Sequence, residues 1–383
     1  MKLREKTLFG RQQFNKGNGL SRRQFIHGAG AAAAVAIAGT STRHFVGKAL
    51  GTSGAQHEGS VNSPNRGLFR QHPADYNSEL RRSEMQILER NDLPGGLVRE
   101  QLRLPGFDPD EAVPAVAIHP ASGGPFPVAI CLHSFRGAKE NLEGWCRDLA
   151  ARGVFAITID AHLHGERSIA GIFHGDNIAS LGGEYSIWVH QTSIARTVKD
   201  IPVILDALAR RPDIDASRVA ATGVSMGASA AMVLAWREPR VCVVASIVGA
   251  VDFWWDVTKT PPGPEQESRK ASYGPRLREL VASIDPKPRF GRIPPKSLFI
   301  ASSGRDEYID IESVRRFVAD LEPLYKKDRD RLRFLPFSEA GHGVTEAMWK
   351  EAQEWIVRGL KKGPSGPIFD EGAAEPAAER GRK

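Results

Sequence analysis

The sequence predicts an α/β protein in which strands and helices alternate within one doubly wound domain. Three observations lead to this fold class. Alternating strand and helix patterns continue over about 270 residues, which is enough chain to bury a large core. The apolar run 219–222 leads through one sharp turn into the small-residue run 228–231. A buried strand over 296–301 and a further short strand over 332–336 each end in a loop that carries polar side chains.

Residues 1–55 are predicted to be an export signal. A pair of arginines, Arg22 and Arg23, is followed by Phe25 and then by a weakly apolar run over 28–39. This run is dominated by Ala and Gly and is too short to cross a bilayer. The pattern resembles a twin-arginine signal, with a disordered basic tail as the alternative. We therefore expect a periplasmic or secreted protein that the twin-arginine translocation machinery exports, without a stable membrane anchor.

Positive charge is concentrated in the same leader. The chain has a formal net charge of +7, and residues 1–50 hold nine Lys or Arg against Glu5 alone. The first 50 residues therefore contribute +8, and the remainder carries −1. A nearly neutral mature protein gives no indication of nucleic-acid binding.

The rest of the chain is predicted to be one domain with extended ends. Residues 56–94 are polar and rich in Asn, Arg and Ser, and we interpret them as a lead-in arm. Residues 95–362 hold the alternating pattern of the main, catalytic domain. Residues 363–383 have few apolar side chains and are predicted to be disordered.

The G-x-S-x-G motif over 223–227 is the most informative functional pattern. It follows a predicted strand and precedes a predicted helix. Such a turn forces Ser225 into a strained backbone conformation and exposes its hydroxyl above a sheet. The pentapeptide alone recurs by chance, so the strand-turn-helix context is what indicates a nucleophile.

A serine nucleophile needs a base, and the base needs a carboxylate that orients it. Asp306 lies in the loop after the first of the two later strands, with Glu307 and Asp310 as alternatives for the acid. His342 lies in the loop after the second and is the only histidine after residue 190. Loops at the carboxyl ends of strands gather at one edge of an open α/β sheet. The predicted chemistry is therefore acyl transfer.

Acyl transfer also needs amide donors for the oxyanion that forms on the substrate carbonyl. The residue after the nucleophile, Met226, supplies the first backbone amide. The second is expected from the loop after the strand 127–132. We predict the amide of Phe135, with Ser134 as the alternative, and we interpret His133 as a structural residue of that loop rather than a second base.

The chain resembles the α/β-hydrolase superfamily over roughly residues 95 to 362. The likeness rests on the serine turn and on four preceding motifs: Ile130-Cys131-Leu132-His133, Ala156-Ile157-Thr158-Ile159-Asp160, His164-Gly165-Glu166-Arg167 and Arg211-Pro212-Asp213-Ile214-Asp215. It is most similar to the branch with dienelactone hydrolase-like proteins, acetyl esterases and the catalytic domains of prolyl-oligopeptidase-type peptidases. The resemblance implies a mostly parallel sheet of about eight strands with helices on both faces, a Ser-Asp-His triad and no cofactor. Dienelactone hydrolases proper use a cysteine nucleophile, so Ser225 departs from them.

Cysteine and histidine spacing indicates neither a disulfide nor a metal centre. Cys131 and Cys242 lie in apolar runs typical of central strands, and Cys146 lies in a predicted helix, so buried free thiols are expected. No spacing resembles a zinc site, although His162 and His164 are two places apart. The family resemblance explains His164 as part of a turn after a strand.

Specificity is expected to come from two segments that lie near the predicted site. These are the loop 168–186 and the insertion 251–295, which contains Phe253-Trp254-Trp255. The aromatic trio is as typical of a core beneath the insertion as of a pocket wall. Arg305 and Arg167 are candidates for binding an anionic substrate, although arginines are common on surfaces.

Together these patterns predict an exported serine hydrolase that cleaves small-molecule carboxylic esters through an acyl-enzyme. Ser225 is the predicted nucleophile, His342 the general base and then acid, and Asp306 the carboxylate that orients His342. A peptidase or amidase with the same triad is one alternative. A non-catalytic protein of the same fold that binds a ligand or partner is the other.

Overall fold

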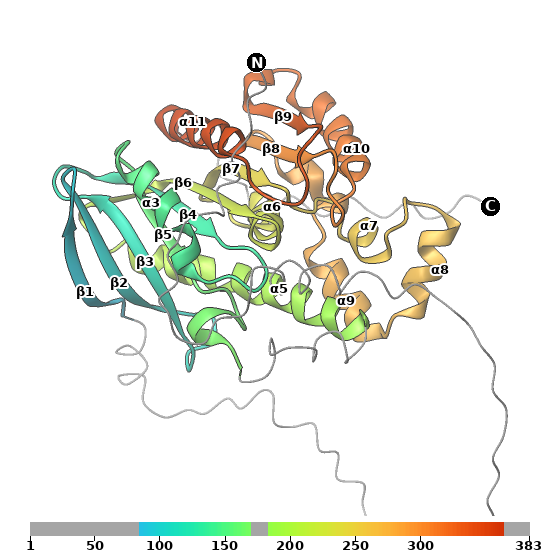
Figure 1. Ribbon diagram of the computed structural model, residues 1–383, viewed down its shortest axis with the longest axis horizontal. Coiled ribbons are helices and arrows are strands. Elements are labelled where there is room, and N and C mark those ends of the chain that lie inside the picture. Colours follow the sequence, from blue (N-terminus) through green and yellow to red (C-terminus); the bar gives the residue numbers. More distant parts are fainter. Residues whose placement is uncertain (1–83, 170–182, 364–383) are drawn as a thin grey trace, which may run out of the picture. The chain divides into compact units, whose positions relative to one another are not determined.

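The computed structural model describes residues 84–169 and 183–363, and a nine-stranded sheet forms the centre of this part of the chain (Figure 1). The strands are β1 (Gln86–Leu93), β2 (Leu97–Pro105), β3 (Ala112–Pro120), β4 (Phe126–Leu132), β5 (Phe155–Ile159), β6 (Ile214–Val224), β7 (Val241–Ile247), β8 (Ser297–Ser303) and β9 (Leu332–Phe337). Their spatial order is β1-β2-β3-β5-β4-β6-β7-β8-β9. The pairs from β1 to β5 are antiparallel, and all pairs from β5 through β4 to β9 are parallel. The predicted mostly parallel, doubly wound sheet is confirmed, with nine strands.

Helices cover both faces of this sheet (Figure 1). The α-helices are α3 (Glu143–Ala150), α5 (Gly183–Leu208), α6 (Met226–Arg237), α7 (Phe253–Thr258), α8 (Pro264–Ser272), α9 (Pro275–Ile284), α10 (Ile311–Leu321) and α11 (Glu346–Lys362). The short 3₁₀ helices are η1 (Lys139–Leu142), η2 (Gly165–Arg167), η3 (Lys287–Arg292), η4 (Glu322–Tyr325) and η5 (Arg329–Arg331). Helices α3 and α11 pack on one face, and α5, α6, α9 and α10 pack on the other. Within the described ranges, none of the helices combines the length and apolarity that crossing a membrane requires.

The central strands are apolar on both sides because helices bury both faces of the sheet. In β4, Val128, Ile130 and Leu132 point into the core beneath α5 and α6, whereas Ala129 and Cys131 point toward α3 and α11. All five side chains are buried. This arrangement explains why the sequence shows a continuous apolar run here rather than an alternating one.

The sheet begins earlier than the predicted boundary at residue 95. β1 pairs antiparallel with β2 and therefore belongs to the sheet, although it falls within the predicted lead-in arm 56–94. Seven of its eight residues are exposed. A strand with solvent on both faces carries no period-two apolar pattern, so β1 could not be predicted from the apolar periodicity. The remainder of the arm, the predicted leader 1–55 and the predicted tail from residue 364 onward lie outside the described residues.

The three cysteines are buried and unpaired, as predicted. Cys131 lies in β4, Cys146 in α3 and Cys242 in β7. Burial raises the pKa of the Cys146 and Cys242 thiols. Both sulfurs therefore stay protonated and serve as small apolar core groups.

The insertion between β7 and β8 folds into α7, α8, α9 and η3. Phe253 and Trp255 are buried, and Trp254 is half-buried at the edge of the same core. Phe253 therefore belongs to the core beneath the insertion and Trp254 packs against that core, whereas Trp255 is buried beside the loop that follows β8.

Asp285 joins the two ends of this insertion. Its Oδ1 accepts hydrogen bonds from the backbone N–H of Phe253 at 3.1 Å and of Lys287 at 3.0 Å. Burial raises the pKa of Asp285 to about 7, and the nearby carboxylate of Asp252 adds to the effect. The folded insertion thus holds a carboxyl group that stays protonated well above its ordinary range.

We expect Asp285→Asn to remove a pH-dependent loss of stability. The unfolded chain ionises this carboxyl above a pH of about 4, whereas the folded chain keeps it protonated up to a pH of about 7. The stabilisation from the protonated Asp285 carboxyl is therefore complete below this pH window. As the pH rises through the window, the free energy of unfolding falls by about 1.4 kcal/mol per pH unit. Urea unfolding near the two ends of the window measures the difference. An equal fall in the free energy of unfolding for both proteins would contradict the assignment.

Candidate active site

Ser225 lies at the sharp turn between β6 and α6. Its backbone has φ 53° and ψ −113°, a conformation that is strained for any residue other than glycine. A Cβ atom on Gly227 would overlap the carbonyl oxygen of Leu132, and one on Gly223 would lie 2.5 Å from the backbone of Gly227. Only glycine at both positions lets α6 start so close to β4 and β6. The Ser225 N–H donates to the carbonyl of Ile247 at 3.0 Å, which holds the turn in place.

The structure brings Ser225, His342 and Asp306 into one hydrogen-bonded chain. Nε2 of His342 lies 2.9 Å from Oγ of Ser225, and Nδ1 lies 2.9 Å from each carboxylate oxygen of Asp306. An ionised carboxylate only accepts, so Nδ1 carries the ring proton and donates it to Asp306. The lone pair on Nε2 is then available to accept from the Ser225 hydroxyl. This is the arrangement in which a serine loses its proton to a histidine.

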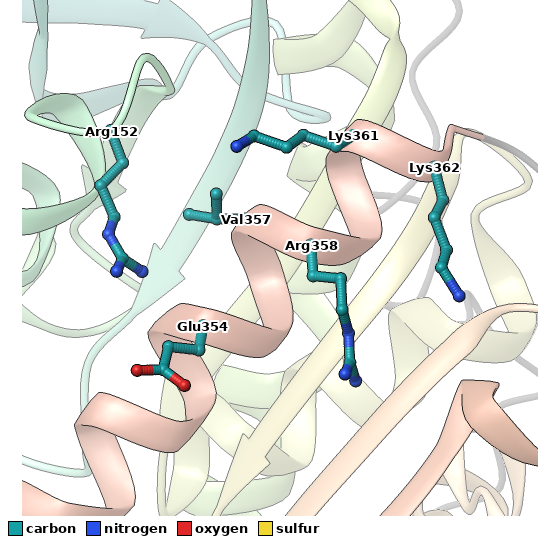
Figure 2. Close-up of a pocket in the computed structure, with 6 residues that line it drawn as sticks. All are labelled: Arg152, Glu354, Val357, Arg358, Lys361 and Lys362. Carbon is teal, nitrogen blue, oxygen red and sulfur yellow. The ribbon is translucent and has the colours of Figure 1, made fainter.

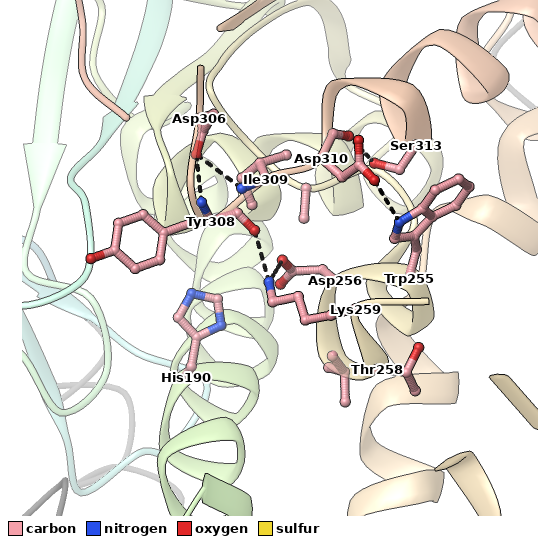
Figure 3. A network of polar contacts seen from close by, with 12 residues as sticks. His190, Trp255, Asp256, Thr258, Lys259, Asp306, Tyr308, Ile309, Asp310 and Ser313 are labelled. Carbon is pink, nitrogen blue, oxygen red and sulfur yellow. Dashed lines mark hydrogen bonds and ion pairs between the residues drawn. The ribbon is translucent and has the colours of Figure 1, made fainter. Parts of the chain in front are cut away.

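Asp306 is held by its own loop, residues 306–310, which we call the acid loop. The side chain is 1% exposed, and Oδ1 accepts from the N–H groups of Tyr308 and Ile309 at 2.9 Å each (Figure 3). These two amides and the His342 ring satisfy a carboxylate that would otherwise be buried without partners.

The two alternative acids make other contacts. Glu307 accepts from the backbone N–H of His342 at 3.4 Å and does not reach the ring. Asp310 is the N-cap of α10, where it accepts from the N–H of Glu312 at 2.9 Å. Of the three carboxylates, Asp306 is the one that contacts the histidine ring.

The loops that carry the acid and the base are tied to each other. The N–H of Gly304 donates to the carbonyl of Phe337, and the N–H of Arg305 donates to that of Ala340, both at 2.9 Å. The ring of Tyr308 packs edge-on against the ring of His342, with centroids 4.8 Å apart. Both loops leave neighbouring parallel strands, β8 and β9, so these contacts follow from the sheet order.

The two predicted oxyanion donors lie at the same edge of the sheet as Ser225. β4 and β6 are parallel neighbours in which Leu132 pairs with Gly223, so the loop after β4 lies beside the serine turn. Phe135 is in this loop, and Met226 is the first residue of α6. An amide at a helix N-terminus also carries the partial positive charge of the helix dipole. The roles of the two amides remain predictions.

The loop that contains Phe135 is fastened at both ends. His133 Nε2 accepts from the N–H of Ala161 at 3.0 Å, and its Nδ1 donates to the carbonyl of Ser134 at 2.8 Å. Lys139 donates to the buried Asp160 from its backbone N–H and from Nζ, at 2.9 Å each. Burial lowers the pKa of His133, so its ring stays neutral. His133 is thus a structural residue of the loop, with both ring nitrogens occupied.

The arginines considered for anion binding are paired with carboxylates of the protein. Arg167 is 3% exposed and pairs with Glu111 and Asp200 at 2.9 Å each. Arg305 is exposed and pairs with Glu339. Neither guanidinium is left without a counter-charge.

Two hollows lie near these elements. A cavity of about 200 Å³ lies beside the acid loop, lined by Trp255, Asp256, Lys259, Gly304, Asp306, Glu307, Tyr308, Ile309, Asp310, Ile311 and Ser313. A wider, open hollow of about 610 Å³ lies along the outer side of α11 (Figure 2). Arginine, lysine, valine and glutamate side chains line the second one, and no triad residue does. The larger hollow therefore lies apart from the predicted triad.

The sequence patterns did not identify the supporting contacts. Lys139 and Asp160 come from different loops and carry no motif that pairs them in sequence. His190, on α5, packs edge-on against Phe135 with ring centroids 5.3 Å apart, and only the fold brings them together. Among residues 84–169 and 183–363, no group of three or more His, Cys, Asp or Glu is placed to hold a metal ion.

Comparison with known proteins finds that the chain is similar to hydrolases. A family model described as the prolyl oligopeptidase family matches residues 174–361. "Putative esterase YitV" of Bacillus subtilis is 23% identical over 242 residues, which span 60% of this chain and 88% of that protein. "Putative carboxymethylenebutenolidase" of Methylorubrum extorquens is 26% identical over 147 residues, 38% of this chain and 47% of that protein. The crystal structure of TT1662 from Thermus thermophilus matches with a TM-score of 0.53 and 19% identity, covering 69% of this chain and 98% of that one.

We expect Asp306→Asn to lower kcat for a p-nitrophenyl ester by about 10³-fold to 10⁴-fold. The amide no longer holds the His342 ring in the tautomer that accepts the serine proton. Glu307→Gln is the matched control, because it keeps the acceptor for the His342 backbone and changes only charge. Steady-state kinetics of both variants make the comparison. A comparable loss in Glu307→Gln would argue against Asp306 as the acid.

Proposed function

We propose that this chain is a member of the α/β-hydrolase superfamily and an exported serine hydrolase that cleaves carboxylic esters through an acyl-enzyme. The observation that carries the proposal is the hydrogen-bonded chain from Ser225 through His342 to Asp306. The similarity to proteins described as an esterase and a carboxymethylenebutenolidase supports an esterase-like hydrolase.

In the first half-reaction, Ser225 Oγ attacks the ester carbonyl carbon while its proton passes to Nε2 of His342. Asp306 accepts a hydrogen bond from Nδ1 and stabilises the imidazolium that forms. The backbone amides of Met226 and Phe135 would donate to the negative charge that develops on the carbonyl oxygen. His342 then gives its proton to the departing alkoxide, and the acyl group stays on Ser225.

In the second half-reaction, a water molecule replaces the alcohol. His342 takes a proton from this water, which attacks the acyl carbon, and returns the proton to Ser225 as the ester bond to the serine breaks. The products are a carboxylic acid and a regenerated hydroxyl. No step needs a group other than these side chains, two amides and water.

We expect Ser225→Ala to lower turnover of p-nitrophenyl esters by about 10³-fold or more, because no other group can form the acyl-enzyme. The measurement compares both proteins on esters from acetate to octanoate, with circular dichroism to show that the variant is folded. The acyl chain length of the ester with the highest kcat/KM gives the size of the acyl pocket. Substantial activity in the variant would contradict the mechanism, and no activity in either protein would favour a ligand-binding role.

A peptidase or amidase with the same triad is the second candidate, and the match to the prolyl oligopeptidase family favours it. An amine leaves only when protonated, whereas an activated alcohol leaves readily without protonation. Matched ester and amide substrates with the same acyl group therefore separate the two activities. Comparable turnover of both would support the peptidase.

Export is proposed from the leader sequence alone. Arg22 and Arg23, with Phe25 and the apolar run 28–39, support the twin-arginine route. We expect replacement of both arginines by lysine to retain the full chain inside cells. Fractionation of cells that express the wild type and this variant makes the comparison, and equal export of both would contradict this route.

A further inference from the structure

Helix α7 and its C-cap residue, Lys259, each contact the acid loop at one point (Figure 3). Nε1 of Trp255 donates to Oδ2 of Asp310 at 3.2 Å. Nζ of Lys259 donates to the backbone carbonyl of Tyr308 at 2.7 Å. Trp255 is itself buried, with 4% of its surface exposed. The insertion therefore holds both the middle and the end of the acid loop.

These two hydrogen bonds join α7 and the acid loop beside a cavity that no side chain fills. The cavity of about 200 Å³ lies between α7 and the acid loop, and residues of both elements line it. Close packing would resist a shift of the loop, but a cavity offers no such resistance. The two hydrogen bonds therefore restrain the distance between the two elements on this side.

Lys259 has a strained backbone conformation. The contribution of this residue to folding stability does not explain why it occupies such a position. It lies in the left-handed region, with φ 55° and ψ 30°, at the C-cap of α7, where glycine is the usual residue. Its side chain is 57% exposed, so the ion pair with Asp256 at 2.7 Å contributes little to folding. A strained residue with little effect on stability points to a role at a functional site.

The contact with Tyr308 reaches both the acid and the base. The N–H of Tyr308 donates to Asp306 Oδ1, and its ring packs against His342. Lys259 binds the carbonyl of that same residue. A shift of Tyr308 would therefore move the carboxylate and the imidazole away from Ser225 together.

We propose that Trp255 and Lys259 are positioning residues, which hold the acid loop so that Asp306 and His342 are aligned with Ser225. The inference rests on the proposed function, because it concerns the same triad. It gives the insertion a role in catalysis that does not require contact with the substrate. Loss of these contacts should lower kcat, because a small misplacement of a reacting group is costly, and leave KM nearly unchanged.

The experiment compares Trp255→Phe, Lys259→Met and the double variant with wild type on one p-nitrophenyl ester. Trp255→Phe and Lys259→Met each keep an apolar side chain and remove its hydrogen-bond donor. We expect kcat of the double variant to fall about tenfold, with KM within about twofold of wild type. Trp254→Phe and Lys270→Met are the matched controls, because they make the same changes in the same insertion without contacting the acid loop, and they should keep wild-type kcat.

Two further variants of Lys259 separate positioning from stability. Lys259→Gly fits the left-handed backbone without strain, so we expect its Tm to equal or exceed that of wild type while kcat falls as in Lys259→Met. Lys259→Arg keeps a donor for the Tyr308 carbonyl and should restore kcat. A wild-type kcat in the Met, Gly and double variants would overturn the proposal, as would a loss of kcat that only follows a loss of Tm.

Ser225→Ala belongs in the same series, because it tests the proposed function by itself. If Ser225→Ala abolishes turnover and the variants of α7 keep it, only the positioning role fails. If Ser225→Ala keeps turnover, the triad mechanism fails, and the positioning role fails with it.

Discussion

The close approach of α6 to the end of β4 is the constraint on which the rest of the site depends. A side chain at Gly227 would overlap the carbonyl of Leu132, so the helix and strand meet backbone to backbone. This contact fixes where α6 begins, and Ser225 and Met226 are the two residues at that point. It also brings the serine turn beside the loop that contains Phe135. The proposed nucleophile and both proposed oxyanion donors are therefore positioned by one contact between main chains.

The other half of the site is built differently, from loops held by hydrogen bonds. Asp306 is oriented by amides of its own loop, and that loop is tied to the histidine loop on one side and to α7 on the other. Such contacts are easier to change by substitution than a helix packed on a strand. The serine side is thus the rigid part of the site, and the acid and base side is the part that sequence changes can tune.

Much of this could be predicted from sequence because it depends on local order. Ser225, Asp306 and His342 each follow a strand of the parallel part of the sheet, and parallel strands carry such positions to one edge of a sheet. The edge strand β1 was missed because solvent on both faces removes the apolar alternation. The pairing of Lys139 with Asp160 and the contacts of α7 were also missed, because they join segments whose meeting depends on the packed sheet.

The buried cysteines have a consequence under the proposed export route. Cys131, Cys146 and Cys242 lie within the core, and burial keeps the Cys146 and Cys242 thiols protonated. Oxidants and disulfide-exchange enzymes act on accessible thiolates. Under the proposed export route, the chain folds in a reducing compartment and reaches an oxidising one with its sulfurs already shielded. Folding before transport would then spare this enzyme any need for a disulfide-forming catalyst and any risk of incorrect pairing.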